Sequence, residues 1–118
     1  MLTFLMSGCK DTSPTAQSDR LVNKEAAQKM LTSGKVIPID VRTPEEIAEG
    51  KIEGALEIDF KGSGFQSEVS KLDKSATYLV YCRSGRRSAK AVKQMEAIGF
   101  EKCYDLDGGY LAWQKQRN

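Results

Sequence analysis

The sequence contains no histidine, and this absence excludes several kinds of active site. Imidazole is the usual general base near pH 7 and the commonest nitrogen ligand of metals in proteins. Ser-His-Asp triads, Cys-His dyads and zinc sites with histidine ligands are therefore excluded. The three cysteines, Cys9, Cys82 and Cys103, form no C-x-x-C pair and are too few for a four-cysteine zinc site. We expect no metal.

The sequence also lacks a long apolar run and a strong excess of charge of one sign. Its longest uncharged apolar stretch, Tyr78–Cys82, is far shorter than the roughly 18 residues that a membrane span requires. Eighteen Lys and Arg against sixteen Asp and Glu give a net charge of +2, too little to indicate a nucleic-acid partner. The 118 residues, 40% apolar and 29% charged, fit one globular domain.

Residues 1–19 differ in composition from the rest and predict a separate tail. An apolar start, Met1–Met6, is followed by Ser7-Gly8-Cys9 and then by a polar, linker-like segment from Lys10 to Asp19. Small residues directly before a cysteine resemble the processing site of bacterial lipoproteins, where that cysteine carries the lipid. The resemblance is partial, because Leu2–Met6 is shorter than the apolar region of about 7 to 15 residues in a secretory signal, and no basic residue precedes it.

Two interpretations of this tail stay open. The one that we favour is a truncated lipoprotein signal with a lipid on Cys9, which places the domain in the cell envelope, either periplasmic or lipid-anchored. The alternative is an unstructured tail with a stray thiol, which leaves the domain cytoplasmic. A membrane contact is expected only through that lipid.

Residues 20–118 alternate between helical and extended patterns, which predicts an α/β domain with a parallel sheet and helices on both faces. We expect strands at 36–41, 54–59, 77–81 and 102–106. We expect helices from the N-cap Asn23 to about Ser33, from Pro44 to Gly50, over 65–72, from the end of the cysteine loop to Gly99, and over 110–116. Thr43-Pro44-Glu45-Glu46 is a capping box, whereas Pro38 removes a hydrogen-bond donor from its strand.

One segment concentrates residues that can do chemistry: Cys82-Arg83-Ser84-Gly85-Arg86-Arg87-Ser88, between a predicted strand and a predicted helix. Open α/β sheets bind ligands at such positions. Backbone N–H groups of the loop and the helix N-terminus can form a cradle for an anion. Adjacent cations and the helix end should lower the pKa of Cys82 below the reference value of about 8.5. Cys82 is therefore predicted to be a nucleophile that needs no histidine.

Three motifs resemble the rhodanese-type sulfurtransferases: the cysteine loop, Ile39–Glu46 together with Gly50–Ala55, and Leu106–Trp113. They occur in the order and spacing of that family from Leu21 to the C-terminus. The resemblance implies a single-domain rhodanese without a cofactor. Cys82 would accept a sulfane sulfur from a donor such as thiosulfate, hold it as a persulfide and pass it to cyanide or a thiol. One departure is Lys51, where the family usually has histidine; we expect an exposed side chain and a packing difference only.

The remaining loop residues are expected to bind the donor. Ser84 and Gly85 would act through backbone N–H groups, although a tight turn would explain them equally well. The arginines Arg83, Arg86 and Arg87 would attract an anionic donor, with at least one facing the pocket and the others solvated. Ser88 is interpreted either as a first-turn residue of the helix or as a substrate contact.

Three further residues are given structural interpretations first. Asp40 and Arg42 follow or end a buried strand and are expected to form an ion pair or cap that holds the loop before Pro44. Cys103 is interpreted as a small buried hydrophobic residue, with a resolving thiol for Cys82 as the alternative, which requires the two sulfur atoms to lie close together.

Three functions stay open at this stage: a sulfurtransferase enzyme, a persulfide carrier that delivers sulfur to a protein partner, and a cysteine-dependent phosphatase. The related phosphatases place arginine after cysteine and five intervening residues, whereas Arg87 is the fifth residue after Cys82 and Ser88 the sixth. The smaller loop suits one sulfur atom. We therefore favour the enzyme, as a monomer whose partners are a small anionic sulfur donor and a cyanide or thiol acceptor.

Overall fold

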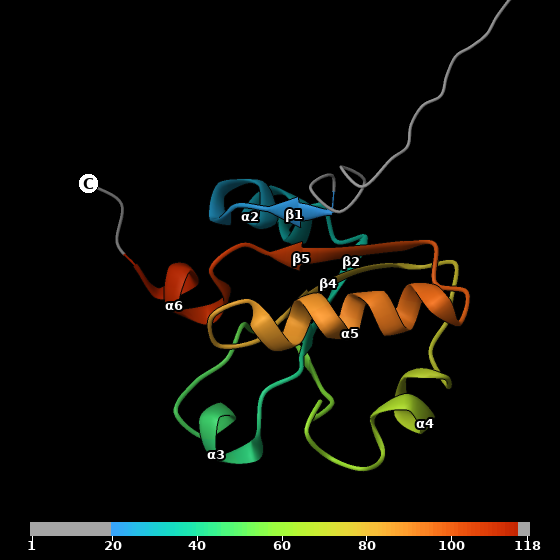
Figure 1. The fold of residues 1–118 in the computed structure, drawn as a ribbon. Coiled ribbons are helices and arrows are strands. Elements are labelled where there is room, and N and C mark those ends of the chain that lie inside the picture. Colours follow the sequence, from blue (N-terminus) through green and yellow to red (C-terminus); the bar gives the residue numbers. More distant parts are fainter. Residues whose placement is uncertain (1–19, 116–118) are drawn as a thin grey trace, which may run out of the picture.

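The computed structural model describes residues 20–115, so the tail with Cys9 and the last three residues lie outside the described residues (Figure 1). A five-stranded parallel sheet has the order β1-β5-β4-β2-β3. The strands are β1 (Leu21–Val22), β2 (Val36–Asp40), β3 (Leu56–Glu57), β4 (Thr77–Tyr81) and β5 (Lys102–Leu106). The helices are α2 (Lys24–Thr32), α3 (Pro44–Ile47), α4 (Phe65–Val69), α5 (Arg86–Ala97) and α6 (Gly109–Gln114). The predicted α/β domain with a parallel sheet is confirmed.

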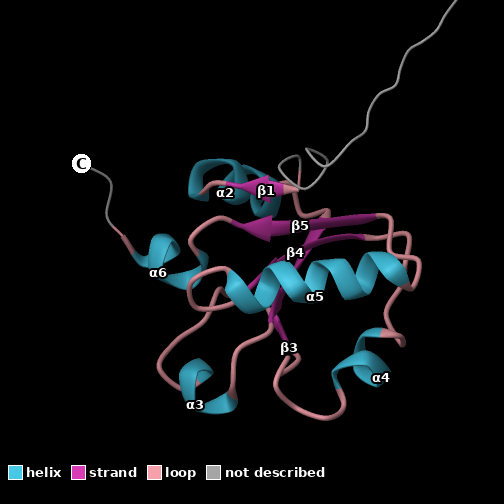
Figure 2. Cartoon of the chain, in the orientation of Figure 1, coloured by secondary structure: helices cyan, strands magenta, loops and turns pink. Residues whose placement is uncertain are grey.

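The central strand β4 separates two apolar layers, because successive side chains of a strand point to opposite faces. Tyr78 and Val80 join the layer under α4 and α5, and Figure 2 shows α5 lying across this face of the sheet. Leu79 and Tyr81 point to the other face, where α2 and α6 pack. Helices therefore cover both faces, and Cys82, the residue after β4, points into the α5 layer.

Pro38 is accommodated in β2 because its nitrogen needs no partner there. The Val41 N–H donates to the Tyr81 carbonyl at 2.9 Å, so odd-numbered residues of this segment direct their N–H groups toward β4. Pro38 directs its nitrogen to the opposite side, where pairing with β3 begins only at Ile39. The missing donor therefore costs no strand-to-strand hydrogen bond.

The structure differs from the sequence-based prediction mainly at the edges of the sheet. Strand β1 was not predicted, because two residues with a half-exposed Leu21 carry no recognisable pattern. Strand β3 spans two residues rather than six, since its pairing with β2 covers only two positions. Helix α4 ends at Val69 rather than at residue 72, and α6 ends at Gln114 with Lys115 as its C-cap. No described helix is long and apolar enough to cross a membrane.

Candidate active site

The cysteine loop runs from the carboxyl end of β4 to the first residue of α5, as the motif predicted. Gly85 is the N-cap of α5 and has a φ of 110°, a left-handed conformation that glycine adopts without strain. The Gly85 N–H donates to the Cys82 Sγ, and the N to Sγ distance is 3.0 Å. The loop therefore places a backbone donor directly on the sulfur atom.

The pKa of Cys82 results from two opposing effects. Burial raises it, because the side chain is almost fully covered, but hydrogen bonding with the Ser88 side chain and with the backbone amides of Ser88, Gly85 and Ser84 outweighs burial and lowers it. The predicted direction of the shift is the one found. Its cause is the hydrogen bonding of the loop, whereas the sequence analysis attributed it to cations and the helix end.

The opposite side of the loop backbone is held by the start of α6. The Tyr110 N–H donates to the Cys82 carbonyl at 2.8 Å, and the Leu111 N–H donates to the Arg83 carbonyl at 3.0 Å. Gly109 precedes these donors with a φ of 61° and lies against the same two carbonyls. This contact was not predicted from the sequence, because nothing in the local pattern of Leu106–Trp113 indicates that α6 meets the cysteine loop.

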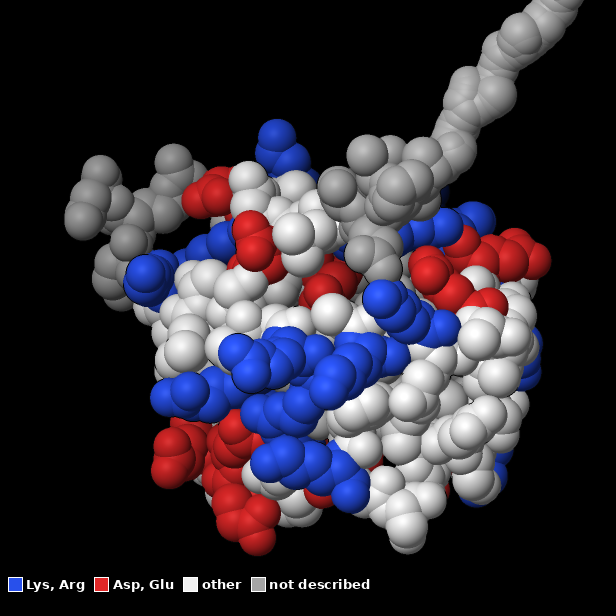
Figure 3. Space-filling view, in the orientation of Figure 1, with Lys and Arg blue, Asp and Glu red and all other residues white. Residues whose placement is uncertain are grey.

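The three arginines of the loop have different surroundings. Arg87 is partly buried and forms a two-pronged pair with Glu46 of α3, with both nitrogen to oxygen distances at 2.9 Å. These hydrogen bonds raise the pKa of Arg87, and the charge of Cys82 acts in the same direction. Arg83 and Arg86 are exposed and form no ion pair with the described residues. Figure 3 shows Lys and Arg gathered over α5, beside an acidic area.

Ser88 lies in the first turn of α5 and is fully buried. Its hydroxyl donates to Asp105 of β5 with an oxygen to oxygen distance of 2.6 Å, and its Oγ lies 3.5 Å from the Sγ of Cys82. Sequence reasoning missed Asp105. The available signal was a carboxylate within a strand whose alternate residue, Cys103, was expected to be buried.

Comparison with known proteins decides the family of this site. Residues 23–116 match the rhodanese-like domain. The chain belongs to the rhodanese family. A sulfurtransferase of Allochromatium vinosum is 31% identical over 93 residues, which cover 79% of this chain and 85% of that protein. Thiosulfate sulfurtransferase 16 of Arabidopsis thaliana, a chloroplastic protein, is 37% identical over 104 residues, covering 80% of this chain and 86% of that protein.

The fold comparison agrees with the family. The crystal structure of a rhodanese-like domain protein from Staphylococcus aureus superposes with a TM-score of 0.72 at 32% identity, covering 82% of this chain and 93% of that one. The human single-domain sulfurtransferase has a TM-score of 0.70 at 25% identity, with 84% and 98% coverage. The predicted family resemblance is confirmed, and this rhodanese-like domain has sulfurtransferases among its relatives.

Asp40 and Arg42 of this rhodanese-like domain form the ion pair expected from the sequence. Both are buried, and their closest nitrogen and oxygen atoms are 2.8 Å apart. The Arg42 guanidinium also donates to the Gly50 carbonyl and lies over the ring of Tyr110, 4.4 Å from its centroid. The pair therefore supports the site indirectly, by connecting β2 to the start of α6.

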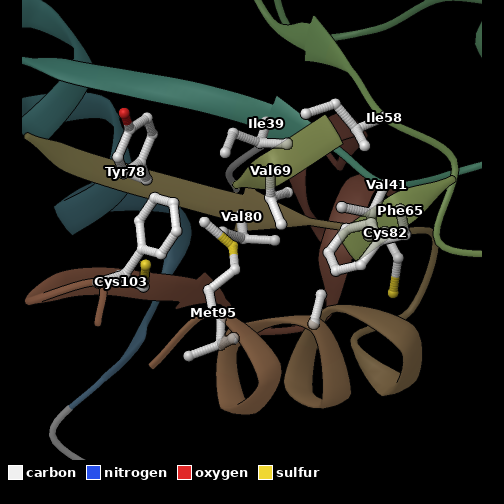
Figure 4. Close-up of a cluster of buried hydrophobic side chains, with 13 residues drawn as sticks. Ile39, Val41, Ile58, Phe65, Val69, Tyr78, Val80, Cys82, Met95 and Cys103 are labelled. Atoms are coloured by element: carbon white, nitrogen blue, oxygen red, sulfur yellow. The ribbon is translucent and has the colours of Figure 1, made fainter. Parts of the chain in front are cut away.

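Cys103 lies too far from Cys82 to resolve it in this fold. Cys103 is paired with Tyr78 in the sheet, and Cys82 is four residues further along. At about 3.3 Å per residue this is roughly 13 Å, whereas a disulfide requires Cα atoms within about 7 Å. Figure 4 shows the two cysteines at opposite ends of one apolar cluster. The interpretation as a small buried hydrophobic residue fits, and the alternative of a resolving thiol is wrong for this conformation.

Lys51 is less exposed than expected. Its side chain is 31% exposed, donates to the Ala55 carbonyl and pairs with Glu57 of β3. Lys51 therefore connects the start of the segment between α3 and β3 to its end.

Removing the charge of Glu46 is expected to weaken the domain at neutral pH and not in acid. The hydrogen bond with Arg87 is the main cause that lowers the pKa of Glu46 from 4.5 to about 2. A carboxyl whose pKa is depressed on folding contributes stability above its unfolded pKa, and loses it as the pH falls toward the folded pKa. Glu46→Gln should therefore lower the free energy of unfolding by about 2 kcal/mol at pH 7, allowing for partial exposure, and by almost nothing near pH 2.

Urea unfolding of both proteins at pH 7, 4 and 2.5 measures this difference. Glutamine keeps the capping box with Thr43. Glu45→Gln is the matched control, since Glu45 is exposed and forms no ion pair with the described residues. A destabilisation by Glu46→Gln that does not change with pH would contradict the role of the charge.

Proposed function

We propose that this protein is a thiosulfate sulfurtransferase that works through a persulfide on Cys82. The observation that carries the proposal is the short contact between the Gly85 N–H and the Cys82 Sγ, at 3.0 Å, in a loop whose other amides also stabilise the thiolate. Amides aimed at a sulfur stabilise its negative charge before and after it acquires a second sulfur. Thiosulfate as donor is supported by relatives that carry the name thiosulfate sulfurtransferase.

The reaction proceeds in two displacements. The Cys82 thiolate attacks the outer sulfur of thiosulfate, the S–S bond of thiosulfate breaks, and sulfite leaves with the bonding electron pair. The product is an anionic persulfide, and the total charge is unchanged. Cyanide then attacks the outer sulfur of the persulfide, thiocyanate leaves, and the Cys82 thiolate is restored. Exposed Arg83 and Arg86 attract the thiosulfate dianion to the loop.

Incubation with thiosulfate should add one sulfur, about 32 Da, to the intact mass of the reduced protein, and cyanide should remove it. Fragmentation of the modified protein should locate the sulfur on Cys82, with Cys103 unmodified because burial raises the pKa of the Cys103 thiol to about 12 and keeps it protonated. A folded, reduced protein that gains no mass would contradict the proposed donor.

A second candidate function is a persulfide carrier for a protein acceptor, and one surface feature favours it. Arg86, Lys90 and Lys93 follow each other at helical spacing on the exposed side of α5, and none forms an ion pair with the described residues. At 1.5 Å per residue, this row of cations extends about 10 Å along α5 from the loop, which is longer than one thiosulfate ion. Cations near a helix N-terminus and like charges one turn apart also destabilise a helix. A persulfide that forms but turns over negligibly with cyanide and small thiols would favour the carrier.

A further inference from the structure

The Ser88 hydroxyl is within hydrogen-bond distance of three groups and has one proton to give. Its Oγ lies 2.6 Å from the Asp105 Oδ1, 3.2 Å from the Gly85 carbonyl and 3.5 Å from the Cys82 Sγ. A hydroxyl donates one hydrogen bond and accepts through two lone pairs. The shortest distance is in the range of hydrogen bonds to an ionised oxygen. Ser88 therefore gives its proton to Asp105 when Asp105 is a carboxylate, and presents a lone pair to Cys82.

Asp105 is a buried acid with an unusual lack of cations around it. Its exposed fraction is 7%, and it forms no ion pair with any residue from 20 to 115. Its side chain bonds to Ser88, while its backbone N–H donates to the Arg20 carbonyl at 2.7 Å and fixes this end of β5. An unpaired buried carboxylate is costly, so the arrangement favours a proton on Asp105 whenever one is available.

We propose that Asp105 accepts the proton of the Cys82 thiol through the Ser88 hydroxyl. The inference rests on the proposed role of Cys82 as nucleophile. In the starting state the thiol S–H donates to Ser88 and the Ser88 O–H donates to the Asp105 carboxylate. The thiol proton moves to the Ser88 oxygen as the original Ser88 proton moves to Asp105. The products are a thiolate, a serine and a carboxylic acid, so atoms and charge balance.

The transfer reverses both hydrogen bonds without breaking the chain. After it, the Asp105 carboxyl donates to Ser88 and Ser88 donates to the sulfur anion. Asp105 contacts Ser88 and not the sulfur, so it is a positioning residue rather than a catalytic one. It supplies the acid–base function for which the sequence contains no histidine.

The direction of the pKa changes agrees with this exchange. Burial raises the pKa of Asp105 to about 6, with the charge of Asp107 adding to the effect and the Ser88 hydrogen bond opposing it. The pKa of Cys82 is lowered by its loop, despite burial. The pKa values of Asp105 and Cys82 are therefore closer to each other than those of a free aspartic acid and a free thiol. The two groups can share one proton.

Other charged groups lie near Asp105 and Cys82. Arg87 on α5 interacts with the charge of Cys82 and is itself paired with Glu46. The remaining ones are Asp59 after β3, which acts on Arg87, Asp107 after β5, and Arg20 before β1. The hydrogen bonds with Glu46 raise the pKa of Arg87, so its positive charge stays constant while the proton moves.

The test is the pH dependence of Cys82 alkylation by iodoacetamide, with the modified residue quantified by mass spectrometry. In wild type, the rate of Cys82 alkylation should rise with pH in two steps. The first step, near pH 6, is the loss of the first proton from the Cys82–Asp105 pair, and the second, above the ordinary range of thiol pKa values, is the loss of the second proton. In Asp105→Asn the alkylation rate should rise in a single step. This step should end at a lower pH than the upper step of wild type, because no carboxylate at position 105 opposes the ionisation of Cys82. Ser88→Ala should reduce alkylation at pH 6 about tenfold, equivalent to one unit of thiol pKa.

Matched variants separate proton acceptance from packing. Ser88→Thr retains the hydroxyl and should retain both steps, and Asp107→Asn, two residues from Asp105, should also retain both. A single step in wild type, or two steps in Asp105→Asn, would overturn the proposal.

If Asp105→Asn does not fold, infrared spectroscopy of wild type at pH 7 provides the test. A carbonyl band of a carboxylic acid should be present and should disappear once Cys82 is alkylated. Absence of this band before alkylation would overturn the proposal. Because no sulfur donor is used, this test can fail while thiosulfate still adds a sulfur to Cys82, and the reverse.

Discussion

Replacing Cys82 with Ser should reduce thiocyanate formation from thiosulfate and cyanide by roughly 10³-fold or more. Four hydrogen bonds of the loop lower the pKa of the Cys82 thiol, but the same bonds cannot ionise an alcohol to a useful extent near neutral pH. The serine fits the cavity and keeps a hydrogen-bond acceptor for the Gly85 N–H, so the domain should fold. Initial rates at fixed thiosulfate and cyanide concentrations measure the loss.

The matched control is Cys103→Ala. Cys103 is equally buried in the same apolar cluster and lies four residues away from Cys82 in strand register. The variant should lose about 1 kcal/mol of unfolding free energy through the small cavity and keep its turnover. Turnover retained in Cys82→Ser, or lost in Cys103→Ala at full folding, would contradict the assignment of the nucleophile.

Replacing Gly109 with Ala should displace the cysteine loop and lower the free energy of unfolding by about 3 kcal/mol. A Cβ at this position would lie 2.5 Å from the Arg83 carbonyl oxygen and 2.6 Å from that of Cys82. Both contacts are with backbone, so no side-chain rotation relieves them. The same two carbonyls accept the Tyr110 and Leu111 N–H groups, and the clash therefore breaks the bonds that orient the loop. Turnover should fall at least tenfold. Enzyme assays measure this loss, and urea unfolding of the same preparation measures the loss of stability.

Gly34→Ala isolates the cost of the left-handed backbone from the cost of the clash. Gly34 has a φ of 77°, close to that of Gly109, but a Cβ there would meet no atom within 4 Å. It should cost about 1 kcal/mol of stability and leave turnover unchanged. If the two alanine variants are equally stable and equally active, α6 does not position the loop.

The elements that sequence predicted correctly are those specified by nearby residues. The helix cap at Asn23 and the capping box at Thr43 are present, since each depends on residues within one turn. Strands β2 and β4 have apolar runs long enough to be recognised, whereas β5, with Lys102 and Asp105 among its five residues, was recognised from its place between the end of a helix and a glycine turn. In contrast, β1 and β3 are two residues each and exist only because a neighbouring strand offers hydrogen bonds, which the local pattern does not contain.

The candidate site likewise has features that the local sequence predicts and contacts that it does not predict. The position of Cys82 between a strand and a helix, and the glycine that turns the loop, could be read from the motif. The contacts of Asp105 with Ser88 and of α6 with the loop join residues 17 or more positions apart in sequence, across three elements of the fold. Such contacts depend on how β5 and α6 pack, so a single sequence did not predict them.

The double attachment of the loop has a consequence for how the protein can be altered. The groups that hold the sulfur and the groups that hold the loop are mostly backbone atoms: amides face inward to Cys82, and carbonyls face outward to α6. The exposed side chains at positions 83, 84 and 86 take no part in either attachment. Substitutions at these three positions should therefore change the attraction of the anionic donor and the surface that an acceptor meets, while both backbone attachments and the position of the Cys82 sulfur stay unchanged.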